Sequence, residues 1–207
     1  MWYSILIAVL TSYFLGNLNG AVLVSAMMHD DVRSHGSGNA GLTNFIRNFG
    51  AGRAVYVIFI DAGKAALSCA LGGLLLKPYG MELAGLTIGG TAAMVGHMFP
   101  VLLAFRGGKG ILSGLFVALC VDWRIAVVIL AIFALVYFTT QYVSLSSVLA
   151  ALGFSASFAI FHYDYLAVMI PGVCIGLLAV FMHRANIGRL LRGEERKTNL
   201  FSRGKQA

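Results

Sequence analysis

The sequence predicts an all-α, polytopic integral membrane protein with seven transmembrane helices, the N-terminus outside and the C-terminus in the cytoplasm. Hydrophobic residues make up 59% of the 207 residues, charged residues only 11%, and the mean hydropathy is +0.85. A packed soluble core does not absorb that much apolar surface. Apolar blocks recur from Trp2 to Phe181, so we expect one integral membrane domain over residues 1–207, ending in a short basic tail at about 183–207.

Several apolar blocks have the roughly 17 to 25 residues that a membrane-spanning helix needs. The clear blocks are residues 2–28, 53–76, 83–105, 145–161 and 165–182, the last two joined by a turn at 162–165. The first block lacks a basic region in front of it and is too long for the apolar core of a signal peptide. We therefore expect it to remain as the first span.

The remaining apolar region, residues 110–142, is interrupted once, at Asp122, Trp123 and Arg124. If this interruption is a tight turn, it separates a short span from a longer one and the chain has seven spans. If it is a bend within one helix, the chain has six.

Positive charge favours seven spans. That count puts twelve of the fifteen Lys and Arg residues on one side, in residues 29–53, 106–109 and 183–207. With six spans, the basic tail would face away from the other basic loops, against the usual cytoplasmic bias. The formal charge of +7 therefore indicates cytoplasmic membrane loops, and we expect no nucleic-acid partner.

The small residues of the spans predict packing more than chemistry. Cys69, Cys120 and Cys174 lie inside apolar blocks, so we expect them to pack as small side chains, without disulfide, metal-binding or nucleophilic roles. No cluster has the ligand spacing of a metal site, and we expect no metal and no cofactor. A four-residue spacing that lets helix backbones approach closely occurs at Gly85/Gly89, Gly110/Gly114 and Gly172/Gly176.

The first basic loop contains a glycine-rich polar stretch, His35-Gly-Ser-Gly-Asn-Ala-Gly-Leu-Thr-Asn-Phe-Ile-Arg-Asn-Phe-Gly50. Its glycines allow positive φ and can present consecutive backbone N–H groups to an anion, with Arg47 as a bidentate partner. The pattern favours phosphate binding. An ordinary flexible loop has the same composition, because Gly and Asn are the commonest turn formers.

The second polar stretch runs from Gly96 to Gly110 and ends in Arg106-Gly-Gly-Lys-Gly110. It resembles a phosphate-cradling turn, but it lacks the full nucleotide P-loop pattern and follows a membrane helix instead of a strand. Anchoring of a helix end by Arg106 and Lys109 is the alternative. His97 lies inside an apolar span, so we expect it to face the bundle interior as a ligand or a structural hydrogen-bonding residue.

The third polar stretch follows the last span, from His183 to Glu195. On a helix His183 and Asn186 share a face, with Arg189 three residues further on. A basic amphipathic tail on anionic lipid explains the arginines but not the His and Asn. Asp61 and Lys64 lie three apart in the second span, either as a neutralised structural pair or as a wall of the site.

Together these stretches resemble the bacterial acyl-phosphate:glycerol-3-phosphate acyltransferase family. The matches are Gly-Ser-Gly-Asn-x-Gly-x-Thr-Asn-x-x-Arg-x-x-Gly at 36–50, Gly-His-x-Phe-Pro-Val with Gly-Gly-Lys-Gly at 96–110, and His-Arg-x-Asn-Ile-x-Arg-Leu-x-x-Gly-x-Glu at 183–195. Ser12-Tyr13-x-Leu15-Gly16 and Asp61-x-x-Lys64 extend the resemblance nearly from end to end.

The sequence departs from the family pattern at three places. Asn17-Leu18-Asn19 replaces the usual Ser-Ile-Pro, Ser113 stands where Thr is common, and Glu194 replaces the Thr that usually precedes the glutamate. These differences concern the packing of the first span more than the catalytic chemistry.

The resemblance implies a seven-helix bundle in the bacterial cell membrane with its active site facing the cytoplasm. It implies transfer of a fatty acyl group from acyl phosphate to the primary (sn-1) hydroxyl of glycerol 3-phosphate, giving lysophosphatidic acid and inorganic phosphate. The expected partners are these two substrates, membrane lipid and the soluble or peripheral enzyme that makes acyl phosphate.

The resemblance and the charges also indicate site residues. The expected catalytic residues are His183, Asn186, Ser37, Arg47 and Lys109. The expected substrate-binding residues are Gly36, Gly38, Asn39, Thr43, Asn44, His97, Gly107, Gly108, Asp61, Lys64, Arg189 and Glu195. His183, His97 and a substrate phosphate oxygen all remain candidates for the base.

Two other functions compete with this interpretation. A transporter or channel for a phosphorylated anion also has basic constrictions, although here the polar residues cluster at one surface. The second alternative is an acyltransferase whose donor is acyl-CoA or acyl carrier protein. The His-x-x-x-x-Asp pair typical of soluble thioester-dependent acyltransferases has no persuasive cytoplasmic copy here.

Overall fold

The computed structural model describes residues 1–198, and within them every regular element is helical. The end of the predicted basic tail, with Arg203 and Lys205, lies outside the described residues. The elements are α1 Trp2–Gly16, α2 Gly20–Ala26, η1 Val32–Ser34, α3 Leu42–Phe49, α4 Ala54–Leu76, η2 Lys77–Tyr79, α5 Glu82–Met98, η3 Val101–Leu103, α6 Ile111–Val121, α7 Trp123–Thr140, α8 Val143–Phe161, α9 Leu166–Met182 and α10 Arg184–Leu191.

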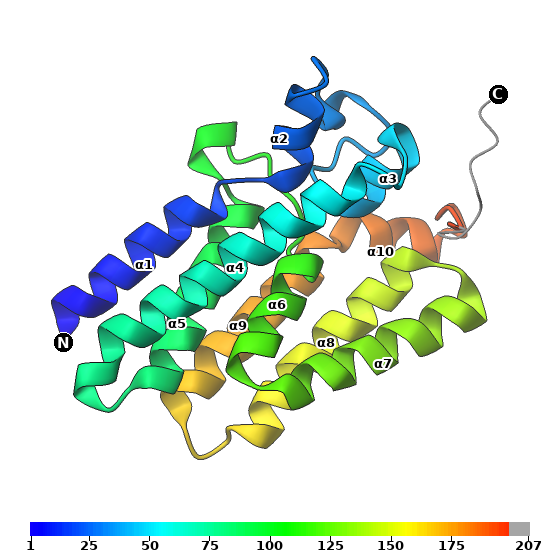
Figure 1. Ribbon diagram of the computed structural model, residues 1–207. Coiled ribbons are helices and arrows are strands. Elements are labelled where there is room, and N and C mark those ends of the chain that lie inside the picture. Colours follow the sequence, from blue (N-terminus) through cyan, green and yellow to red (C-terminus); the bar gives the residue numbers. More distant parts are fainter. Residues whose placement is uncertain (199–207) are drawn as a thin grey trace.

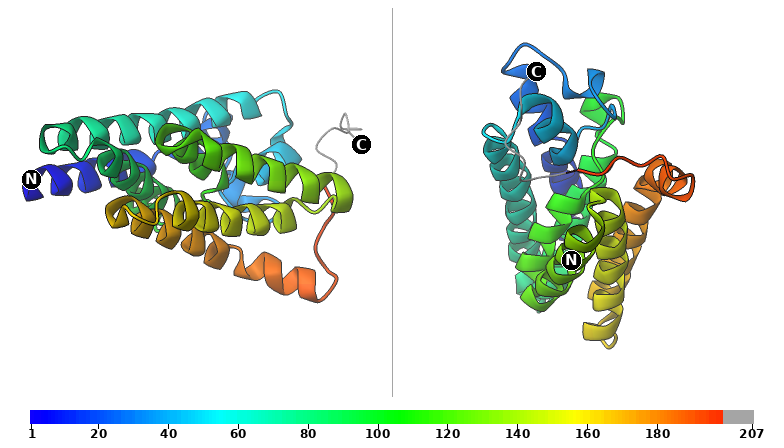
Figure 2. Two further views of the ribbon diagram at one scale, coloured as in Figure 1. Left: turned by 90° about the horizontal axis from the view of Figure 1, so that it is seen from below. Right: turned by 90° about the vertical axis from the view of Figure 1, so that its right-hand side faces the viewer.

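The long helices run side by side in one bundle (Figure 1). α1, α4 and α5 pack against each other, α7, α8 and α9 pack in sequence, and α6 lies between α4, α5 and α7. The short helices α2, α3 and α10 gather at the end of the bundle away from the N-terminus (Figures 1 and 2). The three polar stretches of the sequence therefore meet at one end.

Length and composition identify four helices that can cross a membrane, α4, α5, α7 and α8, among the described residues. Two bent pairs pass the same test together, α1 with α2 at 41° and α9 with α10 at 52°. α6 has 11 residues and so is about 16 Å long, roughly half of a bilayer core. The all-helical membrane fold is confirmed, whereas seven spans and the side of each terminus stay predictions.

The interruption at Asp122 is a turn. Asp122 has extended backbone angles and its side chain accepts a hydrogen bond from the N–H of Arg124, which caps the start of α7. Figure 1 shows the chain reversing direction there, so that α7 runs back along the bundle from the end of α6. Of the two alternatives for residues 110–142, the structure has two helices.

The predicted span over residues 2–28 is not one straight helix, because the helix is broken between Gly16 and Gly20. Asn19 caps α2 by accepting from the N–H of Val22, and its amide donates to the carbonyl of Ala40 in the first polar loop. Asn17 accepts from the N–H of Leu102. The two asparagines thus stabilise the break and connect it by hydrogen bonds to the first polar loop and to the loop after α5.

A buried ion pair stabilises the two helix ends at this break. Lys64 Nζ lies 3.2 Å from the carbonyl oxygen of Gly16 and 2.7 Å from that of Leu18, where α1 ends. Asp61 accepts from the N–H of Gly20 at the start of α2 and pairs with Lys64 at 2.8 Å. A cation at a helix C-terminus and an anion at an N-terminus are both stabilised by the helix dipole.

The predicted span 83–105 ends early, at Met98. Pro100 disfavours helical geometry in the residue before it and has no N–H to continue the helix. The chain then turns through η3 and returns, so that the N–H of Gly108 donates to the carbonyl of His97 at 3.0 Å. α6 consequently starts inside the bundle, which explains why it is short.

Glycines let α4 and α5 approach closely, as predicted for Gly85 and Gly89. A Cβ on Gly85 would lie 2.2 Å from the carbonyl oxygen of Gly72, and one on Gly89 would lie 2.1 Å from that of Ser68. The predicted pair Gly172 and Gly176 packs against side chains of α8, because a Cβ on Gly172 would lie 2.2 Å from the Phe158 ring and one on Gly176 would lie 2.2 Å from the Ser155 hydroxyl. The prediction that the cysteines pack as small side chains inside the bundle holds only in part. Cys69 is buried, but Cys174 is exposed.

Replacing Gly89 with alanine is expected to destabilise the bundle by about 1–3 kcal/mol, because the backbone of Ser68 cannot move aside as a flexible side chain could. Gly63 in α4 is the matched control, since a Cβ there meets nothing within 4 Å. Gly63→Ala should be neutral or stabilising by up to about 1 kcal/mol. Thermal unfolding in detergent compares the two variants, and equal melting temperatures would contradict the tight α4–α5 contact.

Candidate active site

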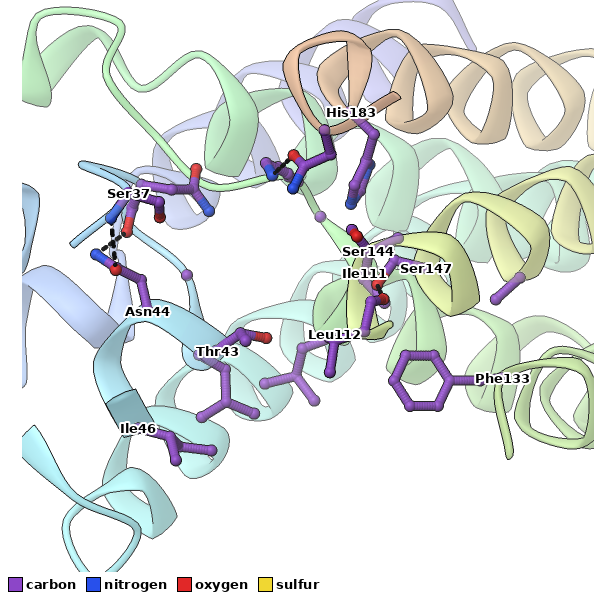
Figure 3. A pocket seen from close by; sticks show the side chains of 18 of the residues that line it. Ser37, Thr43, Asn44, Ile46, Ile111, Leu112, Phe133, Ser144, Ser147 and His183 are labelled. Atoms are coloured by element: carbon purple, nitrogen blue, oxygen red, sulfur yellow. Dashed lines mark hydrogen bonds between the residues drawn. The ribbon is translucent and has the colours of Figure 1, made fainter. Parts of the chain in front are cut away.

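A cavity of about 360 Å³ lies where the three polar stretches meet. One end is polar and contains most of the predicted site residues. The other end is apolar and is formed by side chains of α6, α7 and α8 (Figure 3). These apolar residues are Ile111, Leu112, Leu115, Ile129, Leu130, Phe133, Val143 and Ala150. Leu130 lines the cavity and is 48% exposed, so the apolar end reaches the apolar outer surface of the bundle at α7.

Four helix N-termini converge on this cavity, those of α3, α6, α8 and α10. The cavity is lined by residues from the first turn of each of these helices. None of the four helices has a side-chain N-cap. Unpaired N–H groups at a helix N-terminus carry partial positive charge and bind anions. The backbone therefore favours a phosphate here before any side chain is counted.

The first polar loop is held in shape by Asn44, which is buried. Its Nδ2 lies 3.0 to 3.1 Å from the carbonyl oxygens of Val32, His35 and Asn39, and its Oδ1 accepts from the N–H of Ser37 at 3.0 Å. Gly36 needs to be glycine, because it has φ +58° and a Cβ would lie 2.5 Å from Asn44 Oδ1. Asn44 therefore organises the loop that presents Ser37 to the cavity.

Three cationic side chains reach the polar end, Arg47 from α3, Lys109 from the second loop and Arg189 from α10. Burial, together with the nearby positive charge of Arg189, lowers the pKa of Lys109 to about 8. Its Nζ donates to Oδ1 of Asn186. An anion in the cavity would meet three positive charges, of which Lys109 is the most desolvated.

Asn186 and Glu195 connect these cations. Asn186 accepts from Lys109 and donates through Nδ2 to Glu195 at 2.9 Å, and Arg189 Nε donates to the same carboxylate at 2.6 Å. Burial opposes ionisation of Glu195, but these hydrogen bonds outweigh it and hold its pKa below the usual value. Both ends of the Asn186 amide are thus occupied within the protein, and Asn186 orients Lys109.

His183 begins α10 and is buried, with its ring lining the cavity (Figure 3). Its Nδ1 lies 2.8 Å from the carbonyl oxygen of Ala179. A carbonyl only accepts hydrogen bonds, so Nδ1 carries the proton and Nε2 of the neutral ring is left with its lone pair. The free nitrogen of His183 is therefore a proton acceptor.

Residues after α10 cross the polar end towards α7 (Figure 2). The N–H of Thr198 donates to the carbonyl of Gln141 at 3.0 Å, and the Tyr137 hydroxyl donates to the carbonyl of Thr198 at 3.0 Å. The Thr198 hydroxyl also accepts from Arg47. The segment from Glu195 to Thr198 consequently links α10, α7 and α3 around the site.

Most of the predicted site residues line the cavity. They are Ser37, Asn39, Thr43, Asn44, Arg47, Asp61, His97, Lys109, His183, Asn186, Arg189 and Glu195. Gly36, Gly38, Gly107, Gly108 and Lys64 do not line it. The N–H groups of Gly38 and Gly108 donate to the carbonyls of His35 and His97, so they are not available to a phosphate. The glycines instead allow close packing, since a Cβ on Gly107 would lie 2.0 Å from the carbonyl oxygen of His97.

Sequence reasoning missed the apolar wall and two serines of α8, Ser144 and Ser147, which also line the cavity. Nothing in the sequence separates these apolar side chains from others in the same spans. Within residues 1–198, no three His, Cys, Asp or Glu side chains are grouped closely enough to hold a metal ion.

Comparison with known proteins adds to this geometry. The family model described as glycerol-3-phosphate acyltransferase matches residues 6–193. The glycerol-3-phosphate acyltransferase of Prochlorococcus marinus (strain MIT 9215) is 34% identical over 200 residues, which cover 94% of this chain and 98% of that protein. That of Thermoanaerobacter sp. (strain X514) is 37% identical over 196 residues, covering 94% and 96%.

Two crystal structures of PlsY (YgiH), an integral membrane glycerol 3-phosphate acyltransferase, have the same fold. The glycerol 3-phosphate form has a TM-score of 0.83 and 31% identity, and the match covers 96% of this chain and 100% of that one. The lysophosphatidic acid form has a TM-score of 0.79 and 30% identity, with 95% and 96% covered.

Proposed function

Because the chain belongs to the glycerol-3-phosphate acyltransferase family, we propose that it transfers a fatty acyl group from acyl phosphate to the sn-1 hydroxyl of glycerol 3-phosphate. The products are lysophosphatidic acid and inorganic phosphate. PlsY has been crystallised in a glycerol 3-phosphate form and a lysophosphatidic acid form, which supports this acceptor and this product.

The observation that carries the proposal is the continuity of the cavity. A cationic end with four helix N-termini leads directly into an apolar end that reaches the lipid-facing surface of α7. Such a cavity fits one small dianion and one phosphate that carries a long chain. The arrangement favours acyl transfer over transport of an anion, because the residues lining the far end are apolar.

Acyl phosphate suits this cavity chemically. It is a mixed anhydride with a good leaving group, so the site needs chiefly to position the substrates and stabilise negative charge. The acceptor oxygen attacks the acyl carbon, the bond from that carbon to the phosphate oxygen breaks, and inorganic phosphate leaves with the electron pair. Arg47, Lys109 and Ser37 would hold the phosphates and neutralise the charge that develops.

The hydroxyl proton has an acceptor in His183. Its hydrogen bond to Ala179 leaves Nε2 unprotonated and turned to the cavity, which supports His183 as the general base. After phosphate leaves, the proton on the imidazolium can pass to solvent or to phosphate.

The distribution of charge supports one orientation in the membrane. Arg47, Lys109 and Arg189 line the cavity, and α3 and α10 lie at that end of the bundle, which supports placing this end and the C-terminus in the cytoplasm. The proposal treats residues 1–207 as one integral membrane acyltransferase domain of a bacterial cell membrane. A water-soluble acceptor then enters from the cytoplasm and the donor from the bilayer, where the enzyme that makes acyl phosphate would deliver it.

The donor is tested directly with purified protein in detergent. Three donors with the same acyl chain, acyl phosphate, acyl-CoA and acylated acyl carrier protein, are offered separately and then in competition. Radiolabelled glycerol 3-phosphate is the acceptor. We expect lysophosphatidic acid from acyl phosphate alone, with phosphate released in equal amount. Product formation only from a thioester donor would overturn the choice of donor while leaving the family unchanged.

The Michaelis constant for glycerol 3-phosphate is expected to rise as the pH increases through about 8, where Lys109 titrates in the free protein. The dianion binds the charged ammonium, so deprotonation above this pH removes an attraction. The phosphate itself stays dianionic, because its second pKa is about 6. Lys109→Arg keeps the charge, and its Michaelis constant should not change over the same range. A wild-type constant that is flat across pH 8 would contradict the role of Lys109.

A further inference from the structure

The second histidine of the cavity, His97, is held by Lys64. It lies near the end of α5 and is 4% exposed. Its Nδ1 is 2.7 Å from Nζ of Lys64, which comes from α4 and is also buried at 4% exposure. Neither residue contacts solvent freely, so the bond between them is set by the bundle.

The surroundings of Lys64 fix the direction of that hydrogen bond. Besides His97, Nζ lies within hydrogen-bonding distance of the carbonyl oxygens of Gly16 and Leu18 and of Asp61 Oδ1, at 3.2, 2.7 and 2.8 Å. Carbonyl and carboxylate oxygens only accept hydrogen bonds in this setting. An ammonium has three N–H donors and no acceptor, so Lys64 donates to its three nearest partners, the Leu18 carbonyl, Asp61 and His97, while the more distant Gly16 carbonyl shares one of these protons.

Facing a donor, Nδ1 of His97 has to accept. Asp61 offers no alternative, because its Oδ1 is 3.7 Å from Nδ1, beyond hydrogen-bonding distance. The proton of the neutral ring then sits on Nε2. His97 and His183 thus have opposite tautomers, and His97 presents a donor where His183 presents an acceptor.

The Nε2 edge of His97 faces the loop that carries Lys109. A Cβ on Gly108 would lie 2.2 Å from Nε2, so glycine alone lets the ring reach this position. No residue among 1–198 makes a hydrogen bond to Nε2, and His97 lines the cavity. Because His97 lines the cavity, a substrate oxygen placed there can accept a hydrogen bond from this N–H.

We propose that Lys64 is a positioning residue for glycerol 3-phosphate binding: by donating to Nδ1 it fixes the proton of His97 on Nε2, which donates to a phosphate oxygen. The choice of glycerol 3-phosphate rests on the proposed function. His97 is accordingly a phosphate ligand and not the base, and Lys64 acts on substrate without touching it. This role is separate from the support that Lys64 gives to the break between α1 and α2.

The tautomer of His97 is measured by ¹⁵N NMR of histidine-labelled protein in detergent, with His97→Gln identifying its signals. We expect a neutral ring protonated on Nε2 in the wild type, and a signal that shifts when glycerol 3-phosphate is added. A ring protonated on Nδ1, or on both nitrogens at neutral pH, would overturn the proposal. This measurement needs neither turnover nor a Lys64 variant.

A double-mutant cycle separates positioning from simple support of the fold. Glutamine places an amide N–H near the position of Nε2 and has no tautomers, so His97→Gln keeps a donor that Lys64 does not control. Lys64→Met is made in the wild type and in the His97→Gln background, and the dissociation constant for glycerol 3-phosphate is measured in all four proteins.

We expect Lys64→Met to weaken binding about tenfold to a hundredfold in the wild-type background, the usual effect of one hydrogen bond to a charged group, and much less beside His97→Gln. Equal losses in both backgrounds would mean that Lys64 is only structural and would overturn the proposal. If Lys64→Met does not fold, the wild-type NMR result decides. Binding without acyl transfer from acyl phosphate would contradict the proposed donor and leave this inference standing.

Discussion

Replacing Lys109 with alanine is expected to lower kcat/KM for glycerol 3-phosphate by about a thousandfold. Lys109 is the most buried cation of the cavity and is oriented by Asn186, so its loss leaves a phosphate dianion in a partly desolvated site with one charge less. Removing one partner of a buried, hydrogen-bonded charge pair costs about 2–5 kcal/mol. The value of kcat/KM is measured from the rate of lysophosphatidic acid formation at varied concentrations of glycerol 3-phosphate.

Lys77→Ala is the matched control, because Lys77 is exposed in η2 and pairs only loosely with Glu82 at 3.5 Å. Its activity should equal that of the wild type. Arg47→Ala should resemble Lys109→Ala, since Arg47 lines the same end of the cavity. Near-wild-type rates in monodisperse Lys109→Ala protein would remove Lys109 from the site.

Much of the fold could be predicted because the bilayer imposes one strong constraint. Spans have to be long and apolar, so composition locates α4, α7, α8 and α9, and the start of α5, to within a few residues. Asp122 was recognisable as an interruption because a charge inside a span is costly, and it proves to be the N-cap of α7.

The broken ends of two spans could not be predicted, because their stabilising partners are distant in sequence. Hydropathy alone gives residues 2–28 as one helix, but the free carbonyls at Gly16 and Leu18 are satisfied by Lys64, 46 residues or more away. Met98 ends α5 just before Pro100, which hydropathy does not weigh, and the chain then returns so that the N–H of Gly108 donates to the carbonyl of His97. Both features depend on tertiary contacts that hydropathy does not encode.

The site divides in the same way. Its polar members, such as Arg47 and His183, stand out in the sequence because polar residues are rare in an apolar chain. Phe133 and Leu112, which form the apolar wall, do not stand out, since every span offers such side chains. The glycine-rich stretches indicated an anion site, but the helix N-termini and not Gly38 or Gly108 leave N–H groups free towards the cavity.

Replacing His183 with alanine is expected to lower kcat by about 10²–10⁴, the usual contribution of a general base. The ring is buried, and its bond to Ala179 leaves Nε2 as the only neutral nitrogen base that the geometry turns towards the cavity from the described residues. His97 cannot replace it, because Lys64 holds the His97 proton on Nε2. Single-turnover rates with saturating acyl phosphate isolate the chemical step from product release.

The effect should fall on kcat, with the dissociation constant for glycerol 3-phosphate changed less than about threefold, since a neutral ring adds little to the attraction of three cations. His97→Ala should show the reverse pattern, weaker binding with a smaller loss of kcat. The two variants therefore separate a proton acceptor from a phosphate ligand. If His183→Ala keeps a wild-type kcat, a substrate phosphate oxygen takes the hydroxyl proton instead, because no other unprotonated histidine nitrogen among residues 1–198 is turned to the cavity.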